Sequence, residues 1–217
     1  MKITGLKRTK RGAYAVFADG QYLFSAQEEA LLRSGLRENM ETDVQALEQL
    51  RQDSEYIFGR EYALRLLERR SYTRQALCQK LSRFVAQDSA RQVADRLESL
   101  GLINDAAYAA ACARDLFRLK GYSVQRIKAH LRQKGIGSEE IAAALEQFEQ
   151  EAQQQRLYEL LCKKYLHRMD TEKGRKKAVD AMLRLGYRYG DIQSALRRAE
   201  EEHGAELFAC SQEESWE

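Results

Sequence analysis

Pairs of apolar residues spaced four positions apart recur along this chain at intervals of about 50 residues. The first set pairs Leu77 with Leu81, Ile127 with Leu131, and Val179 with Leu183. A second set follows it at the same spacing: Val93 with Leu97, Ile141 with Leu145, and Ile192 with Leu196. An i, i+4 pair lies on one face of a helix. The interval suits three helices per unit, so the pattern predicts tandem three-helix repeats.

The absence of proline supports a chain that is helical nearly throughout. None of the 217 residues is proline, and proline is the residue that most strongly interrupts helix interiors. The N-terminus differs, because residues 2–9 and 13–24 alternate as short strands do, with turn sequences at Lys10-Arg11-Gly12 and Asp19-Gly20. We therefore predict a small basic β-hairpin or three-stranded meander ahead of the helices.

Helix starts are marked by hydroxyl and amide side chains. Ser25 to Glu28 and Thr42 to Gln45 have the form of capping boxes, and the long helix after the second box is predicted to break near Gly59. Four further N-caps are predicted in the repeats, at Thr73, Asn104, Ser123 and Ser138. Together these signals frame the helices of the first two repeats.

The predicted fold is mainly α, with the three-helix repeats forming an elongated, curved array after the N-terminal strands. We divide the chain into strands at 1–24, connecting helices at 25–61, repeats at 62–101, 102–151 and 152–200, and a flexible acidic tail at 201–217.

Charge is distributed unevenly along the chain. The formal net charge is only +3, but residues 200–217 contain seven glutamates and no Lys or Arg, which leaves a basic body. Such a body suits polyanions or acidic proteins as partners. No stretch has the roughly 20 apolar residues of a membrane span, and Met1–Gly12 lacks the apolar core of a signal peptide. We expect a cytoplasmic protein that does not contact membranes.

Motifs for catalysis or cofactor binding are missing from the sequence. There is no phosphate-binding loop, dinucleotide fingerprint, zinc-protease motif or nucleophile elbow. The three histidines are dispersed, and the four cysteines lie far apart without a C-x-x-C pair, which favours buried free thiols over a metal site or disulfides. We expect no enzyme activity, no cofactor and no bound metal.

Basic residues recur at one predicted turn in each repeat. The runs are Arg69 to Arg74, Arg118 to Tyr122, and Lys173 to Lys177, with tyrosines at 72, 122, 187 and 189. Cations interleaved with aromatic rings suit phosphate or nucleotide contact. Solvated helix faces and half-buried corner packing remain the alternatives. The candidate contact residues are Arg69, Arg70, Tyr72, Arg74, Lys80, Arg114, Arg118, Lys120, Tyr122, Arg126, Lys128, Arg132, Lys134, Lys173, Arg175, Lys176 and Lys177.

Three strings in the repeats resemble the bacterial RecX family, which regulates the RecA recombinase. They are LLERRSYTRQALCQKL, LGLINDAAYAAACARDLFRLKGYSVQRIKAHLRQKGI and EEIAAAL. The resemblance is strong over residues 62–150, fair over 152–200 and weak before residue 60. It implies three-helix units that lie in the groove of the RecA–DNA filament. There they inhibit filament extension, ATP hydrolysis and strand exchange, and so regulate DNA repair, recombination and the SOS response.

The resemblance implies a monomer whose partners are the RecA nucleoprotein filament and single-stranded or double-stranded DNA. Two other functions remain open. A stand-alone DNA-binding regulator with helix-turn-helix-like units predicts sequence preference without RecA, although basic residues spread over three units count against it. A helical scaffold predicts affinity for neither DNA nor RecA.

Overall fold

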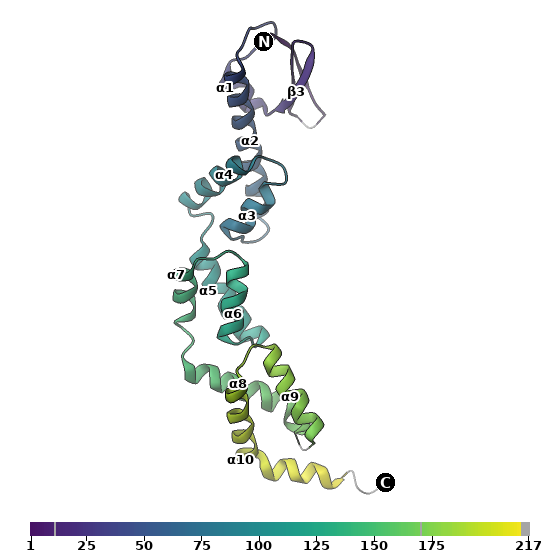
Figure 1. Cartoon of the computed structure of the whole chain (residues 1–217), viewed down its shortest axis with the longest axis vertical. Coiled ribbons are helices and arrows are strands. Elements are labelled where there is room, and N and C mark those ends of the chain that lie inside the picture. The colour runs from purple at the N-terminus through teal and green to yellow at the C-terminus, as the bar shows by residue number, and fades with distance from the viewer. Residues whose placement is uncertain (11, 170, 214–217) are drawn as a thin grey trace. The chain divides into compact units, whose positions relative to one another are not determined.

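The chain consists of two compact units, residues 1–104 and 105–217, and Figure 1 labels their α-helices and strand β3. The computed structural model describes residues 1–10, 12–169 and 171–213, and for residues 204–213 it describes the backbone alone. The first unit contains the strands and the first repeat, and the second unit contains the other two repeats. The prediction of a mainly helical chain with a small N-terminal sheet is confirmed.

The N-terminal sheet is the predicted three-stranded meander. Strands β1 (Ile3–Arg8), β2 (Tyr14–Ala18) and β3 (Gln21–Ala26) are antiparallel and neighbour one another in chain order. Asp19 and Gly20 join β2 to β3 with positive φ angles of 49° and 82°. Tight two-residue hairpins require such angles, which is why Asp-Gly signals them.

Two helices cover one face of the sheet and supply its core. They are α1 (Glu28–Ser34) and α2 (Val44–Leu67). A small sheet is marginally stable by itself, and here its inner side chains pack against the helices. The cluster includes Ile3, Val16, Ala18, Ala26, Ala30, Leu50 and Ile57.

Both predicted capping boxes in this region place the N-cap at the wrong residue. Ser25 remains in β3, and Gln27 precedes α1 without a side-chain cap. In α2 the cap is Asp43 rather than Thr42, because the Asp43 carboxylate accepts a hydrogen bond from the Ala46 amide at 2.7 Å.

Helix α2 also continues through Gly59, where a break was predicted. A Cβ atom at Gly59 would lie 3.3 Å from Cγ2 of Val93. The glycine therefore permits close packing of another helix and does not interrupt α2.

The first repeat consists of the second half of α2 with α3 (Arg74–Leu81) and α4 (Gln87–Ser99). Thr73 caps α3 as predicted, because its hydroxyl accepts a hydrogen bond from the Ala76 amide. The predicted apolar pairs lie in one core, which includes Ala63, Leu77, Leu81, Val93 and Leu97.

The second repeat begins with α5 (Asp105–Asp115), which continues into a π-helical turn, η1 (Leu116–Lys120). It ends with α6 (Val124–Gln133) and α7 (Ser138–Leu145). Ser123 caps α6 as predicted, whereas Ser138 is the first residue of α7 and Gly137 occupies the cap position. Ile127, Leu131 and Ile141 are buried in its core.

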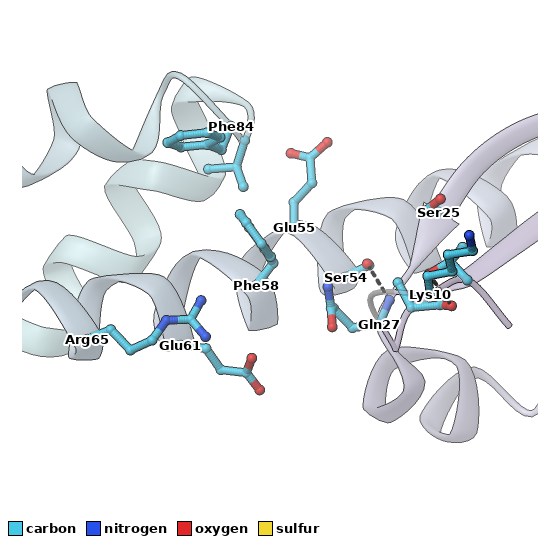
Figure 2. A pocket seen from close by; sticks show the side chains of 12 residues that line it. Lys10, Ser25, Gln27, Ser54, Glu55, Phe58, Glu61, Arg65 and Phe84 are labelled. Atoms are coloured by element: carbon cyan, nitrogen blue, oxygen red, sulfur yellow. Dashed lines mark hydrogen bonds between the residues drawn. The ribbon is translucent and has the colours of Figure 1, made fainter.

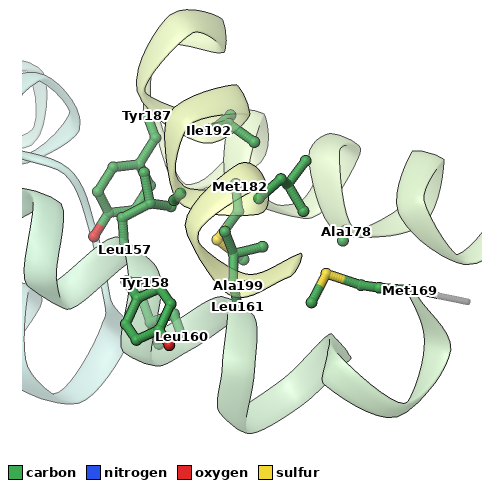
Figure 3. Packing of buried hydrophobic residues seen from close by; sticks show 12 residues of the cluster. Leu157, Tyr158, Leu160, Leu161, Met169, Ala178, Met182, Tyr187, Ile192 and Ala199 are labelled. Atoms are coloured by element: carbon green, nitrogen blue, oxygen red, sulfur yellow. The ribbon is translucent and has the colours of Figure 1, made fainter. Parts of the chain in front are cut away.

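The third repeat consists of α8 (Gln150–Tyr165), a short 3₁₀ turn η2 (Leu166–Arg168), α9 (Glu172–Arg184) and α10 (Tyr189–Glu213). Its predicted alignment is wrong by one residue. Ala178 and Met182 enter the core in Figure 3, whereas Val179 is half-buried and Leu183 is 44% exposed. The i, i+4 spacing is therefore kept, one position earlier on α9.

The acidic tail predicted at 201–217 is helical as far as Glu213, because α10 continues to that residue. Residues 214–217 lie outside the described residues. The flexibility proposed for the tail remains a prediction.

Candidate functional site

The three basic runs differ in local structure. Arg69 and Arg70 lie in the turn after α2, and Arg118 and Lys120 lie in η1. The third run lies within α9, so the prediction that all three occupy one turn is wrong. The reason is the cap: the Thr171 hydroxyl accepts a hydrogen bond from the Gly174 amide at 3.1 Å and starts the helix before the basic run. The third run is therefore a helix face.

In the first and second repeats, an arginine stacks on a tyrosine just before the second helix of the repeat. Cζ of Arg70 lies 4.6 Å from the centroid of the Tyr72 ring, and Cζ of Arg126 lies 4.2 Å from that of Tyr122. A stacked guanidinium interacts favourably with the ring and keeps its in-plane N–H groups available for a phosphate or carboxylate. We call these two arrangements the Arg/Tyr corners.

Each Arg/Tyr corner is followed directly by a buried N-cap. Thr73 follows Tyr72 and Ser123 follows Tyr122, and both hydroxyl side chains are buried. Each hydroxyl accepts a hydrogen bond from the amide three residues later, at 3.2 Å. A buried cap fixes the backbone at the start of the helix, so the stacked pair is held by an ordered turn.

The candidate cations differ in exposure. Six candidate residues are half-buried: Tyr72, Arg74, Lys80, Tyr122, Arg126 and Lys128. The other candidates are exposed: Arg69, Arg70, Arg114, Arg118, Lys120, Arg132, Lys134, Lys173, Arg175, Lys176 and Lys177. The exposed set lies at the surface, where it is accessible to an acidic partner.

Two candidate arginines already form contacts within the fold. Arg74 pairs with Asp95 and Glu98 on α4, and the hydrogen bond with Asp95 raises the pKa of its guanidinium. Arg175 donates a hydrogen bond to the Met169 carbonyl at 2.8 Å and pairs with Glu200 at 2.9 Å. These contacts hold helices together, which makes both residues weaker candidates for contact with a partner.

The third repeat supports the corner of the second repeat. Ser123 Oγ donates a hydrogen bond to the Gly186 carbonyl at 2.6 Å, and the Ser123 amide donates one to the Leu185 carbonyl at 3.0 Å. Arg156 on α8 donates a hydrogen bond to the Arg118 carbonyl at 2.5 Å. Sequence reasoning missed Arg156, because nothing in the pattern of α8 shows that it reaches another repeat.

A cavity of about 260 Å³ lies at this junction, lined in part by Ser123, Gly186, Tyr187 and Arg188. Tyr187 was grouped with the contact tyrosines, but it is buried and its ring belongs to the third core, whereas Tyr189 is exposed. Burial raises the pKa of the Tyr187 phenol to about 12. Its hydroxyl and Nε of Arg156 are buried without a hydrogen-bond partner among the described residues.

Burial shifts the pKa of two thiols and one imidazole in the first two repeats toward the neutral form. Burial raises the pKa of the Cys78 and Cys112 thiols, and burial followed by repulsion from Lys134 and Arg126 lowers the pKa of His130. Cys78, Cys112 and Cys162 are half-buried free thiols, and the side chain of Cys210 lies outside the described residues. Within residues 1–10, 12–169 and 171–203, no group of three or more His, Cys, Asp or Glu is arranged to hold a metal ion.

Among the described helices, none combines the length and apolar character of a membrane span. The candidate site comprises two Arg/Tyr corners, a basic face of α9 and exposed cations on neighbouring helices. Such a site can bind phosphates or carboxylates through charge-assisted hydrogen bonds.

This chain is similar in sequence to proteins of the RecX type. Residues 104–145 match the model of the second three-helix domain of RecX. Three similar chains are each named regulatory protein RecX. That of Clostridium perfringens is 26% identical over 204 residues, covering 91% of this chain and 95% of the relative. That of Limosilactobacillus reuteri is 30% identical over 182 residues, covering 81% and 68%. That of Streptomyces coelicolor is 30% identical over 149 residues, covering 67% and 79%.

Two solved structures are similar to this fold. A crystal structure of regulatory protein RecX has a TM-score of 0.62 at 25% identity and covers 89% of this chain and 98% of its own. The crystal structure of RecX from Lactobacillus salivarius has a TM-score of 0.57 at 25% identity, covering 67% and 97%.

Proposed function

Because this chain belongs to the RecX family of regulatory proteins, we propose that it binds the RecA–DNA filament and inhibits the recombinase. In this proposal the chain lies in the filament groove, without catalysis of its own, and limits filament extension, ATP hydrolysis and strand exchange. It would act as a monomer in the cytoplasm, in the regulation of DNA repair, recombination and the SOS response.

The observation that carries the proposal is the repetition of the Arg/Tyr corner in two successive repeats. Arg70 lies over Tyr72 and Arg126 over Tyr122 at similar distances, although the arginine precedes the tyrosine in one case and follows it in the other. Similar geometry reached from different sequence positions points to a constraint on the surface. A periodic partner such as a filament offers the same binding groups at regular intervals.

Charge supports the same partner. Exposed cations accompany both corners, with Arg69 beside the first and Arg118 and Lys120 beside the second. Nucleic-acid phosphates and acidic protein side chains both attract such a surface. Contacts from several repeats of one chain raise the overall affinity through effective concentration, so no single contact has to be tight.

The direct test measures strand exchange and ATP hydrolysis by RecA on single-stranded DNA with increasing amounts of this chain. We expect both activities to fall, and we expect the chain to co-sediment with filaments. A chain that leaves both activities unchanged and stays in the supernatant would refute the proposal. Inhibition with sequence-specific DNA binding in the absence of RecA would favour a stand-alone DNA-binding regulator.

The corner residues give a sharper test. Arg70→Gln and Arg126→Gln remove the stacked charge in the first and second repeats, and the double variant should inhibit more weakly than either single variant. Lys163→Gln with Lys164→Gln is the matched control, because these exposed cations lie in the last turn of α8 and belong to neither Arg/Tyr corner. Equal inhibition by both double variants would move the contact surface elsewhere.

A further inference from the structure

The outer face of the N-terminal sheet carries two aromatic rings beside a lysine. Phe17 and Tyr22 are cross-strand partners on β2 and β3, and their ring centroids lie 5.8 Å apart in an edge-on arrangement. Nζ of Lys7 lies 5.4 Å from the centroid of Phe17. Tyr22 is 56% exposed, although the opposite face of the sheet is buried. An exposed ring with a cation beside it is suited to a flat, negatively charged ligand.

Small residues on the neighbouring strands let the Phe17 ring and the Lys7 side chain lie close to the sheet. Gly5 is the cross-strand partner of Phe17, and Ala15 is the partner of Lys7. A Cβ atom at Gly5 would come within 3.7 Å of the Phe17 ring. Gly5 is itself buried, so the Phe17 ring lies close against β1, and Tyr22 is the exposed ring of the pair.

A cavity of about 590 Å³ lies between the sheet and the helices of the first repeat. Ser25 belongs to both, because its hydroxyl lies 3.1 Å from the Tyr22 hydroxyl and its side chain lines the cavity. Figure 2 shows Ser25 and Lys10 on the sheet side and Phe58 and Phe84 on the helical side. The volume falls in the range of natural ligand sites, about 300–1,000 Å³.

A second group of aromatic side chains forms the helical wall of the cavity. Phe84, in the link between α3 and α4, is 59% exposed. It is held edge-on by Tyr62 at 5.1 Å and by Phe58 at 6.4 Å between ring centroids. Arg65 extends along the same wall, with its Cζ atom 6.0 Å from the Tyr62 centroid. Phe84 is thus an exposed ring accompanied by a cation, across the cavity from Ser25.

Two cations and two carboxylates line the cavity, and one of the carboxylates is already paired within the fold. Lys10 and Arg65 line it together with Glu55 and Glu61. The Glu55 carboxylate accepts hydrogen bonds from Arg51, from the Ala86 amide and from the Ser89 hydroxyl, so its charge is largely compensated within the fold. Glu61 alone among these lining residues then opposes an anion.

We propose that this surface, from Phe17 and Tyr22 through Ser25 to Phe58 and Phe84, binds single-stranded nucleic acid. We call it the aromatic track. Unpaired bases stack on Tyr22 and Phe84, and a backbone phosphate between them contacts Lys10. Every base has a flat face, so stacking needs no particular sequence. A duplex keeps its bases paired inside the helix, so they cannot stack on these rings. An acidic peptide would use the cations but leave both rings exposed.

The test uses the full chain without any recombinase and a fluorescein-labelled oligothymidylate of about 16 nucleotides, the upper site size of small single-strand-binding folds. Fluorescence anisotropy gives the affinity. Tyr22→Ala and Phe84→Ala should each weaken binding by about 5- to 150-fold, which is the usual cost of one lost base stack. Leu32→Ala on α1 is the matched control for loss of an exposed apolar side chain and should bind normally.

Charge variants test the path of the backbone. Lys10→Gln should reduce the slope of log affinity against log salt by about 0.7, the value for one phosphate contact on a single strand. Lys163→Gln, on the third repeat, should leave that slope unchanged. Glu61→Gln should tighten binding, because it removes the opposing carboxylate.

Two results would overturn the proposal. The first is normal oligothymidylate binding by both Tyr22→Ala and Phe84→Ala, in variants whose thermal melts match the unaltered chain. The second is that polyglutamate displaces the oligonucleotide, and that this displacement depends on Lys10 but not on Tyr22 or Phe84. That result would make the surface a site for acidic proteins. Neither result bears on inhibition of RecA by the Arg/Tyr corners, because the assay contains no recombinase.

Discussion

The hydroxyl of Ser123 donates a hydrogen bond to the carbonyl oxygen of Gly186, 2.6 Å away and 63 residues later in the sequence. The same hydroxyl caps α6 by accepting a hydrogen bond from the Arg126 amide. Arg126 in turn stacks on Tyr122. The turn after α9 is therefore part of the structure that orients the Arg/Tyr corner of the second repeat. The corner and the third repeat should consequently respond together to mutation.

Gly186→Ala is expected to destabilise the second unit. The φ angle of Gly186 is 89°, and an added Cβ atom would lie 2.7 Å from both Cβ of Arg126 and Oγ of Ser123. Backbone strain at positive φ costs about 1–2 kcal/mol, and overpacking adds about 1–3 kcal/mol. Chemical denaturation should show a loss of free energy of unfolding near the sum of these effects.

Gly35→Ala separates strain from overpacking. Gly35 also has a positive φ, 68°, but no atom lies within 4 Å of the Cβ position. Its substitution should cost the strain alone. Equal losses of stability in Gly35→Ala and Gly186→Ala would mean that the α6 cap accommodates the added Cβ atom at position 186 without overpacking.

The corrected alignment of α9 predicts unequal effects of neighbouring substitutions. Met182→Ala should cost about 2–5 kcal/mol, the usual range for a buried large side chain, because Met182 is only 1% exposed. Leu183→Ala should cost much less, since Leu183 is largely outside the core. Thermal melts of the two variants decide the alignment, and the opposite order of stability would restore the Val179 and Leu183 frame.

Local sequence signals predicted the first two repeats because each helix presents one clear apolar face. Leu77 with Leu81 and Ile127 with Leu131 are all buried as predicted. In α9 two overlapping i, i+4 pairs compete, and the larger Val179 and Leu183 look more apolar than Ala178 and Met182. Packing against α8 and α10 decides between them. The sequence of α9 alone does not reveal which pair packs against these helices.

The candidate site was predictable in its composition but not in its geometry. The cations and tyrosines could be read from the sequence, whereas the stacking of Arg126 on Tyr122 depends on the helix that Ser123 caps. The hydrogen bond from Arg156 to the Arg118 carbonyl joins residues 38 positions apart. Such contacts come from packing between repeats, and no local pattern signals them.

Charge reversal at exposed positions of η1 should weaken inhibition of RecA without unfolding the chain. Arg118→Glu with Lys120→Glu replaces two exposed cations, and exposed substitutions usually change stability by less than about 0.5 kcal/mol. We expect a higher concentration of this variant to be needed for half-inhibition of strand exchange. The increase should shrink at higher salt, because salt screens exposed charges.

Lys163→Glu with Lys164→Glu is the control, because it changes the net charge equally at exposed positions on α8. It should retain most of the inhibition. Equal weakening by both double variants would indicate a general effect of net charge and would argue against a contact at η1.

Tyr187→Phe should remove a pH dependence of stability at alkaline pH. Burial raises the pKa of this phenol to about 12, whereas a tyrosine in an unfolded chain ionises near pH 10. The unfolded state therefore loses its proton first. The stabilisation is fully present below about pH 10 and is lost as the pH rises to about 12, in total about 2–3 kcal/mol.

Urea unfolding at about pH 9 and about pH 11.5 measures this effect as the difference between the unaltered chain and Tyr187→Phe. At the lower pH the variant should be at least as stable, because the Tyr187 hydroxyl has no hydrogen-bond partner among the described residues. At the higher pH the unaltered chain should lose more stability than the variant. Tyr189→Phe, at an exposed position, should follow the unaltered chain at both pH values. Parallel losses in the unaltered chain and Tyr187→Phe would mean that the Tyr187 phenol reaches solvent in the folded protein.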